Sequence, residues 1–364
     1  MRAVRTRLLP PLLAIAFAAL LCGVVLLISG AQPLNAYGTM IGQLFKGQVA
    51  VEIVNLATTY YLAGLAVAIG FQMNLFNIGV EGQYRFAAAV AAIVGGSIVL
   101  PAGLHALAII VVAVLAGAAY ALIPAILKVT RGVHEVISTI MLNAIVTGII
   151  FYLINPDQFG VQTGNVIKTP EIPQSGWIPG IPLGDAGTMY GFVIIAAVIG
   201  AGYWFVLNRT RFGFELRASG ESPTAAAAGG VSAKRMALTA MLLSGAMAGL
   251  VALPAILGRT HEYGFTSPQG YGFIGIAVAL LGRNHPGGVA FGALLWAFLD
   301  TSAVSLETID VPREITTIMQ GVIVLSVVVA YEIMRRIELT AEQRRVGRAF
   351  AGERASSVSG GGAV

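Results

Sequence analysis

The sequence predicts an all-α polytopic membrane protein with about ten transmembrane helices, on two observations. Of its 364 residues, 57% are hydrophobic and 11% are charged, whereas soluble domains contain about 25% charged residues. The apolar residues also lie in blocks of about 20, the length that a helix needs to cross a bilayer. Forty-five glycines agree with this class, because small residues let helices approach closely in lipid.

Ten apolar blocks follow one another along the chain, and each is predicted to be one span. The first begins after Arg2, Arg5 and Arg7, as a signal peptide would, but its 22 apolar residues are too many and no clear A-x-A cleavage site follows. An uncleaved first span is therefore expected. The eighth block is short and rich in glycine, which indicates a broken or re-entrant helix. The spans are 8–29, 51–72, 82–100, 104–127, 135–154, 189–207, 234–257, 270–282, 287–305 and 314–334.

The positions of the basic residues predict the orientation in the membrane. With a cytoplasmic N-terminus, 18 of the 22 Lys and Arg residues, Arg85 among them, fall on the cytoplasmic side. Cytoplasmic loops carry such an excess. Both termini and the polar segment 208–233 are therefore expected in the cytoplasm. The four basic residues on the outside are Lys46, Lys168, Arg259 and Arg313.

Residues 1–336 are expected to form a single transmembrane domain, followed by a cytoplasmic, partly disordered tail at 337–364. One long external loop, 155–188, contains five prolines and Trp177. Proline interrupts helices and sheet ladders. The loop either caps the bundle or forms part of a docking face for an external protein. Cys22 is the only cysteine, so one chain forms no disulfide.

The segment 74–83 places polar residues and glycines between two apolar helices, and its polar side chains are Asn74, Asn77, Glu81 and Gln83. Irregular backbone at membrane depth is tolerated only where protein or water satisfies its polar groups. Two interpretations stay open: a satisfied turn that joins two spans, or part of a translocation pathway.

The start of the fifth span presents Glu135, Thr139 and Asn143 at helical spacing, so one helix face is polar. Such a face either bonds to a neighbouring helix or lines a pathway. Asp300 lies deeper than most acidic residues, near the outer end of the ninth span. The pairs Gly245/Gly249 and Gly288/Gly292 predict close helix packing.

Several motifs of enzymes are absent from the sequence. It contains no G-x-x-x-x-G-K-[ST] loop for ATP, no H-E-x-x-H, no Cys/His cluster and no G-x-S-x-G. The chain is therefore predicted not to be an enzyme and to need no metal or cofactor. Its net charge of +5 comes from residues scattered at span ends, which does not predict nucleic-acid binding.

Three segments resemble the permease subunits of bacterial ABC importers, in the branch for ribose-like sugars, branched-chain amino acids and nucleosides. The resemblance covers about residues 40 to 336, and the longer nucleoside-importer permease is the most similar form. The segments are Asn77-Ile-Gly-Val-Glu-Gly-Gln83, Glu135-Val-Ile-Ser-Thr-Ile-Met-Leu-Asn143 and Arg209-Thr-Arg-Phe-Gly-Phe-Glu-Leu-Arg-Ala218.

The resemblance implies a type II importer fold and a bacterial plasma-membrane location. It also implies cytoplasmic ATPase subunits that hydrolyse ATP, a second permease subunit of a different chain, and an external substrate-binding lipoprotein. Nucleosides are the expected substrates, with sugars and branched-chain amino acids as alternatives. An ion-coupled secondary transporter using Glu81, or a membrane-embedded enzyme, would be a different class of protein.

The resemblance further implies a short coupling helix, at about 222–229, that seats in a groove of the ATPase. Alanines would form its central contact, and charged residues would form pairs at the rim. The expected coupling residues are Arg211, Phe212, Glu215, Arg217, Glu221, Ser222, Pro223, Ala226 and Ala227.

Overall fold

The computed structural model describes residues 16–330 together with residues 333, 336 and 340. The chain divides into two compact units, one formed by Tyr37–Thr308 and one formed by Met1–Ala36 with Ile309–Val364. The predicted first and last spans lie partly outside the described residues, and so does the predicted tail apart from residue 340.

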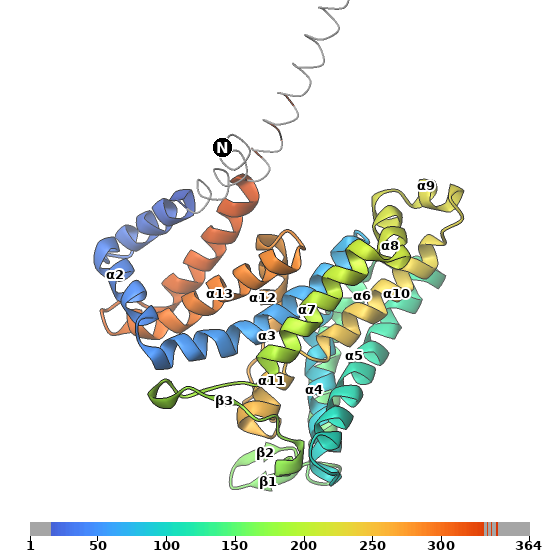
Figure 1. The fold of residues 1–364 in the computed structure, drawn as a ribbon, viewed down its shortest axis with the longest axis horizontal. Coiled ribbons are helices and arrows are strands. Elements are labelled where there is room, and N and C mark those ends of the chain that lie inside the picture. Colours follow the sequence, from blue (N-terminus) through green and yellow to red (C-terminus); the bar gives the residue numbers. More distant parts are fainter. Residues whose placement is uncertain (1–15, 331–332, 334–335, 337–339, 341–364) are drawn as a thin grey trace, which may run out of the picture. The chain divides into compact units, whose positions relative to one another are not determined.

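Helices dominate the described residues (Figure 1). The labelled helices are α2 (Pro33–Leu44), α3 (Gly47–Gln72), α4 (Val80–Ser97), α5 (Leu104–Arg131), α6 (Glu135–Leu153), α7 (Phe192–Arg209), α8 (Arg211–Glu221), α9 (Pro223–Ala228), α10 (Ala233–Ala248), α11 (Leu253–Ala255), α12 (Tyr271–Leu281) and α13 (Pro286–Glu307). A π-helix, η3 (Ile256–Thr260), continues from α11.

Within the described residues, seven helices are long and apolar enough to cross a membrane, or eight if the bent pair Ala16–Ile28 and Pro33–Leu44 is one span. The protein is thus a multi-pass membrane protein, while the predicted count of ten stays a prediction. Three predicted spans are not among the seven, and the first of them, 8–29, corresponds to the first helix of the bent pair. Of the other two, one corresponds to α4, whose first turns are polar, and one to α12, which has only 11 residues.

Helix α3 forms the centre of the larger unit and packs against α10, α12 and α13. In the apolar 18-residue stretch of α3, 83% of the residues are buried, whereas in that of α6 the share is 22%. Close helix approach depends on glycine, as predicted. A Cβ on Gly249 would lie 2.1 Å from the carbonyl oxygen of Ala113, and one on Gly288 would lie 2.3 Å from that of Gly282. The backbones of α5 and α10 are therefore in direct contact. The two sides of the turn between α12 and α13 also meet backbone to backbone.

The predicted external loop is more ordered than a loop rich in proline suggests. It contains two short antiparallel pairs, β1 (Val161–Thr163) with β2 (Val166–Lys168) and β3 (Ile181–Pro182) with β4 (Thr188–Met189). Two 3-10 turns lie beside them, η1 (Gln174–Gly176) and η2 (Gly184–Ala186). These strands were not predicted from the sequence. Their side chains are largely exposed, so apolar periodicity gives no signal for them.

In the smaller unit the described helices are Ala16–Ile28 and Arg313–Ala330. The thiol of Cys22, in the first, lies 3.7 Å from the carbonyl oxygen of Met319, in the second. Cys22 is a free, buried cysteine that packs between helices from the two ends of the chain.

Candidate translocation and coupling sites

The chain turns back on itself after α3. Asn74 adopts a left-handed conformation with φ of 55°, and its side chain is exposed. The amide of Leu75 donates to the carbonyl oxygen of Gly70 over 3.0 Å, which closes the end of α3. Helix α4 begins five residues later, at Val80. We call residues 74–79 the α3–α4 break.

Asn77 holds the α3–α4 break against two helices. Its Nδ2 donates to Ser244 Oγ of α10 over 2.8 Å and to Gln83 Oε1 of α4 over 3.0 Å. Ser244 in turn donates to the carbonyl oxygen of Ala66 in α3 over 2.6 Å. Asn77 and Gln83 are each 1% exposed, so these bonds replace the water that the buried amides lack.

Asn143 connects α6 to the same break. Its Oδ1 accepts from the amide of Gly82 over 2.8 Å, and its Nδ2 donates to the carbonyl oxygen of Ile78 over 3.0 Å. These are backbone groups at the start of α4 that have no partner within the helix. A side-chain amide suits this position because it donates and accepts at once.

Glu81 joins the start of α4 to the start of α12. Its Oε1 accepts from the amide of Gly270 over 2.9 Å, and its Oε2 accepts from the amide of Gly272 over 3.0 Å. The two backbones touch, since a Cβ on Gly272 would lie 2.3 Å from the amide nitrogen of Glu81. Glu81 is 4% exposed and receives a third bond from the hydroxyl of Tyr84.

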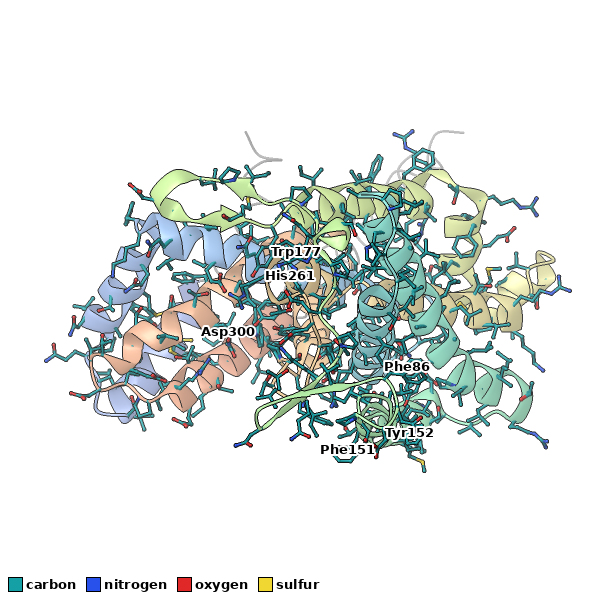
Figure 2. The ribbon with its side chains drawn as sticks, turned by 90° about the horizontal axis from the view of Figure 1, so that it is seen from below. Phe86, Phe151, Tyr152, Trp177, His261 and Asp300 are labelled. Atoms are coloured by element: carbon teal, nitrogen blue, oxygen red, sulfur yellow. The ribbon has the colours of Figure 1, made fainter. Side chains whose placement is uncertain are left out.

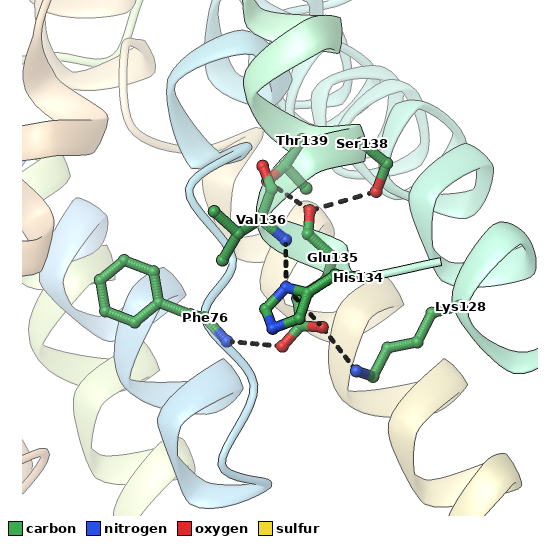
Figure 3. A network of polar contacts seen from close by, with 7 residues as sticks. All are labelled: Phe76, Lys128, His134, Glu135, Val136, Ser138 and Thr139. Carbon is green, nitrogen blue, oxygen red and sulfur yellow. Dashed lines mark hydrogen bonds and ion pairs between the residues drawn. The ribbon is translucent and has the colours of Figure 1, made fainter. Parts of the chain in front are cut away.

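Glu135 begins α6 and pairs with Lys128 near the end of α5 (Figure 3). Its other oxygen accepts from the amide of Phe76 in the α3–α4 break over 3.3 Å. Thr139 donates to the carbonyl oxygen of Glu135 over 2.7 Å and is fully buried. The predicted polar face of α6 therefore lies against the break.

The structure thus gathers the predicted pathway residues around one break, with Asn74 exposed and the others bonded inside the protein. This bonding matches what a satisfied turn requires. A role of these residues in translocation stays a prediction. Among the described residues, no three His, Cys, Asp or Glu side chains form a possible metal site.

A second polar group lies beside Glu81, and of its members the sequence analysis singled out Asp300 but none of the tyrosines. The hydroxyl of Tyr60 in α3 donates to Asp300 in α13, and the ring of Tyr271 packs against both Tyr60 and Tyr84, with centroids 5.7 Å apart in each pair. Arg85 is 6% exposed and interacts electrostatically with Tyr263.

Arg85 is buried within the protein, so it is not one of the loop charges from which orientation is read. The orientation itself stays a prediction. The position of Arg85 in the sequence could have indicated this burial, because it follows Glu81 by one helical turn inside an apolar helix. The excess of basic residues on the predicted cytoplasmic side survives without it.

The predicted external loop is tied to the turn after η3. The ring of Trp177 stacks on that of His261 with centroids 3.7 Å apart (Figure 2). Backbone bonds run beside this stack, from the amide of Ile172 to the carbonyl oxygen of His261 and from that of Ile178 to Leu257, over 2.8 and 3.0 Å. The loop therefore packs on the segment around η3 within the larger unit, as the capping interpretation requires.

The predicted coupling segment forms two short helices, α8 and α9. Thr210 caps α8 by accepting from the amide of Gly213, and Ser222 caps α9 by accepting from that of Ala225. Pro223 occupies the first turn of α9, where a missing amide hydrogen costs nothing. The predicted helix at 222–229 is thus present at Pro223–Ala228.

Only part of the expected surface of this segment is available to a partner. Arg211 pairs with Glu215 across one turn, and Glu221 and Ala227 are exposed. Ala226 is 7% exposed, so the prediction that it forms the central contact is not supported by its position. Phe214, which was not predicted, is 65% exposed on α8.

Arg217 also bonds within the chain. Its guanidinium donates to the carbonyl oxygen of Leu207 at the end of α7, where the last helical carbonyls lack partners. Arg217 thus interacts favourably with the C-terminus of α7. Its expected part in a rim pair stays a prediction. Phe212 faces inward and lines a cavity together with Leu216.

Helix α8 touches the end of α3 at Gly220. A Cβ there would lie 2.4 Å from the carbonyl oxygen of Gln72 and 2.8 Å from the Cα of Met73. The segment expected to meet an ATPase therefore contacts the backbone directly before the α3–α4 break.

The sequence matches the family described as "Branched-chain amino acid transport system / permease component" over residues 49–328. The chain belongs to this permease family. The match includes the α3–α4 break, the coupling segment and α12. ABC permeases work with ATPase and substrate-binding partners, so this permease is a transport subunit of such an assembly.

Three relatives resemble the permease over most of its length. A guanosine ABC transporter permease, NupP of Bacillus subtilis, is 36% identical over 90% of this chain and 95% of its own. A glucose ABC transporter permease, TsgB13 of Haloferax volcanii, is 33% identical over 93% and 90%. A nucleoside ABC transporter permease, NupB of Lactococcus lactis, is 30% identical over 90% and 92%. No solved structure matches the permease.

Proposed function

We propose that this chain is the translocating subunit of an ATP-driven importer of nucleosides. Its 36% identity to a guanosine permease over 90% of its length carries this proposal. A nucleoside permease supports it, whereas the glucose permease supports a sugar as the alternative substrate. Branched-chain amino acids remain a further alternative because the family is described by them.

The proposed assembly contains this permease, a second and different permease, two cytoplasmic ATPase subunits and an external binding lipoprotein. The sequence contains no phosphate-binding loop, so ATP hydrolysis belongs to the partner subunits. Both termini and segment 208–233 lie in the cytoplasm of the proposed assembly. The binding protein supplies the affinity, so the pathway needs no tight site of its own.

Movement of the ATPase subunits reaches the permease through α8 and α9. The contact of Gly220 with Gln72 passes a displacement of α8 to the end of α3. From there the hydrogen bonds of Asn77 and Asn143 connect the α3–α4 break to α10 and α6. In this proposal Asn77, Glu81, Gln83, Glu135, Thr139 and Asn143 position the helices that line the pathway, and Asn74 is accessible to a solute.

The proposed driving force is ATP and not an ion gradient. Glu81 is the carboxylate that an ion-coupled mechanism would use most readily. Both of its oxygens accept backbone amides of α12, which gives the carboxylate a packing role. A proton-coupled carboxylate would instead have to exchange its proton during each cycle.

Uptake by vesicles that contain the whole transporter tests the proposal. Vesicles carrying the permeases and ATPases, with binding protein outside and ATP inside, should accumulate guanosine and related nucleosides. Glucose, ribose and leucine form the comparison panel. ATP-dependent uptake of a sugar or amino acid without nucleoside uptake would show that the proposed substrate is wrong. Uptake that depends on an ion gradient and not on ATP would show that the proposed mechanism is wrong.

A further inference from the structure

A cavity of about 270 Å³ lies where α7, α8 and α10 meet, against α3 and α5. Its lining includes Leu207, Phe212 and Leu216 on one side and Leu243, Met247 and Leu250 on the other. The polar group in the lining, the hydroxyl of Tyr203, already donates to the carbonyl oxygen of Asn284. An apolar cavity of this kind binds apolar groups and excludes water.

The cavity is open toward the bilayer. Leu243 and Val206 form part of its lining and are 40% and 38% exposed. Helix α7 is a candidate membrane span that ends at Arg209, and the span containing α10 begins at Ala233. The exposed lining residues therefore lie on membrane helices, where lipid is the surrounding solvent.

The depth of the cavity matches one leaflet. Twelve residues separate Arg235 from Met247, which corresponds to about 18 Å along a helix. Half of the hydrocarbon core is about 15 Å thick. The cavity therefore extends from the end of the two spans to about the middle of the bilayer, which is farther than a soluble partner can reach.

Basic residues are frequent where the two lining spans end and in the segment that joins them. Five lie between residues 209 and 235, against the two carboxylates of Glu215 and Glu221. The guanidinium of Arg209 lies 5.6 Å from the ring centre of Trp204, an arrangement suited to the interface between lipid and water. Arg209, Lys234 and Arg235 are exposed, and basic side chains at this depth attract anionic lipid headgroups.

We propose that this cavity binds one acyl chain of an anionic phospholipid, whose headgroup contacts Arg209 and Arg235. The bound chain fills the space behind Phe212 and Leu216 and so stabilises α8 against α7 and α10. The proposal goes beyond the proposed substrate, because it applies whatever solute the importer carries.

Native mass spectrometry of the intact transporter complex tests this site. The complex is equilibrated in nanodiscs of equal parts phosphatidylglycerol and phosphatidylcholine and then released in mild detergent. The wild type should retain phosphatidylglycerol. Ala246→Trp places an indole inside the cavity, and retention should fall roughly tenfold, which corresponds to about 1.4 kcal/mol. Val198→Trp, on the 66% exposed face of α7, is the matched control and should retain lipid as the wild type does.

Two further variants keep the outcome decisive. Leu243→Trp fills the cavity from its exposed rim, so it serves if Ala246→Trp fails to fold. Arg209→Gln with Arg235→Gln should remove the preference for phosphatidylglycerol while lipid is still retained. Equal retention by wild type and both cavity variants would overturn the proposal. Loss of the ATPase without loss of lipid would also overturn it. No outcome depends on uptake, so a failure here leaves the proposed function untouched.

Discussion

At the scale of single residues, Glu81 caps the start of α12, which has no capping side chain of its own. The N-cap of α12 is Gly270, which has no side chain to accept the first amides of the helix. Glu81 provides two carboxylate oxygens at those amides from another helix. Neighbouring sequence therefore explains little about how α12 begins.

Replacing Glu81 should separate packing from coupling. Glu81→Gln keeps one acceptor, whereas Glu81→Ala removes both and leaves two buried amides unsatisfied, each costing about 1–3 kcal/mol. Thermal unfolding of the purified permease should therefore show a small loss of stability for Gln and a larger one for Ala. Uptake by Glu81→Gln should be reduced with an unchanged pH profile. Complete loss of transport in a folded, assembled Gln variant would favour an ion-coupled carrier.

His261 predicts a pH dependence of the external loop. Burial against Trp177 lowers the pKa of His261 below its usual 6.5, while Glu171 and Glu262 act in the opposite direction and Glu262 is paired with Lys168. Because the folded state disfavours the proton, the unfolded loop binds more protons as pH falls through about 6.5. The contact is thus fully stable above that pH and weakens as pH falls toward the lowered pKa.

Hydrogen exchange of residues 155–191 measures this effect. After correction for intrinsic rates, amide exchange in this loop should be faster at about pH 5 than at about pH 7. These two pH values lie on either side of the ordinary histidine pKa of about 6.5. His261→Gln should lose the pH dependence. An unchanged profile in that variant would assign the effect to another group.

At the scale of elements, α8 and α9 present a smaller surface than their sequence suggests. Ala226 faces the permease itself, while Ala227 on α9 and Phe214 on α8 face outward. Exposed aromatic residues are frequent anchors at interfaces. The two outward residues are therefore better probes of an ATPase contact than Ala226.

Co-purification of the ATPase measures that contact. Ala227→Glu and Phe214→Ala should each reduce recovery of the ATPase at least about tenfold, as expected for loss of a central contact of about 1.4 kcal/mol or more. Permease abundance should not change. Arg217→Ala should affect permease stability more than ATPase recovery, because Arg217 bonds to α7. Normal recovery and transport in both outward variants would remove α8 and α9 as the coupling surface.

A substitution at Gly220 tests the transmission of movement from α8 to α3 separately from binding of the ATPase. Gly220→Val places a branched side chain where even a Cβ would meet the carbonyl oxygen of Gln72 at 2.4 Å, so α8 must shift from α3. The variant should still bind the ATPase, yet substrate-stimulated ATP hydrolysis and uptake should fall together. Gly230→Val is a poor control because of its positive φ, whereas Gly202→Val has open space and should behave as wild type.

At the scale of the whole molecule, orientation is set by charge and not by packing. The excess of basic residues on one side predicts cytoplasmic termini and a cytoplasmic 208–233 segment. Removing the buried Arg85 from that count does not change its sign. The same prediction puts the two long polar segments, 155–188 and 208–233, on opposite faces of the membrane.

Thiol labelling of intact cells measures orientation. In a Cys22→Ala background, cysteine at the exposed Gln174 should react with an impermeant reagent, and cysteine at the exposed Thr224 should react only after permeabilisation. Ser222 is less suited because it caps α9. Labelling of Thr224→Cys but not of Gln174→Cys on intact cells would reverse the assignment.

The class of protein, most of its helices and the short helix after Ser222 can be predicted from the sequence alone. Blocks of apolar residues and local caps act over a few turns, so a short stretch of sequence is enough to recognise them. The partners of the polar residues depend on the tertiary fold. Asn77 bonds to Ser244, Glu81 to Gly272 and Arg217 to Leu207, and each pair except the last spans more than 100 positions. A buried polar group takes whichever partner the fold brings near, because leaving it unsatisfied costs more than any local preference provides.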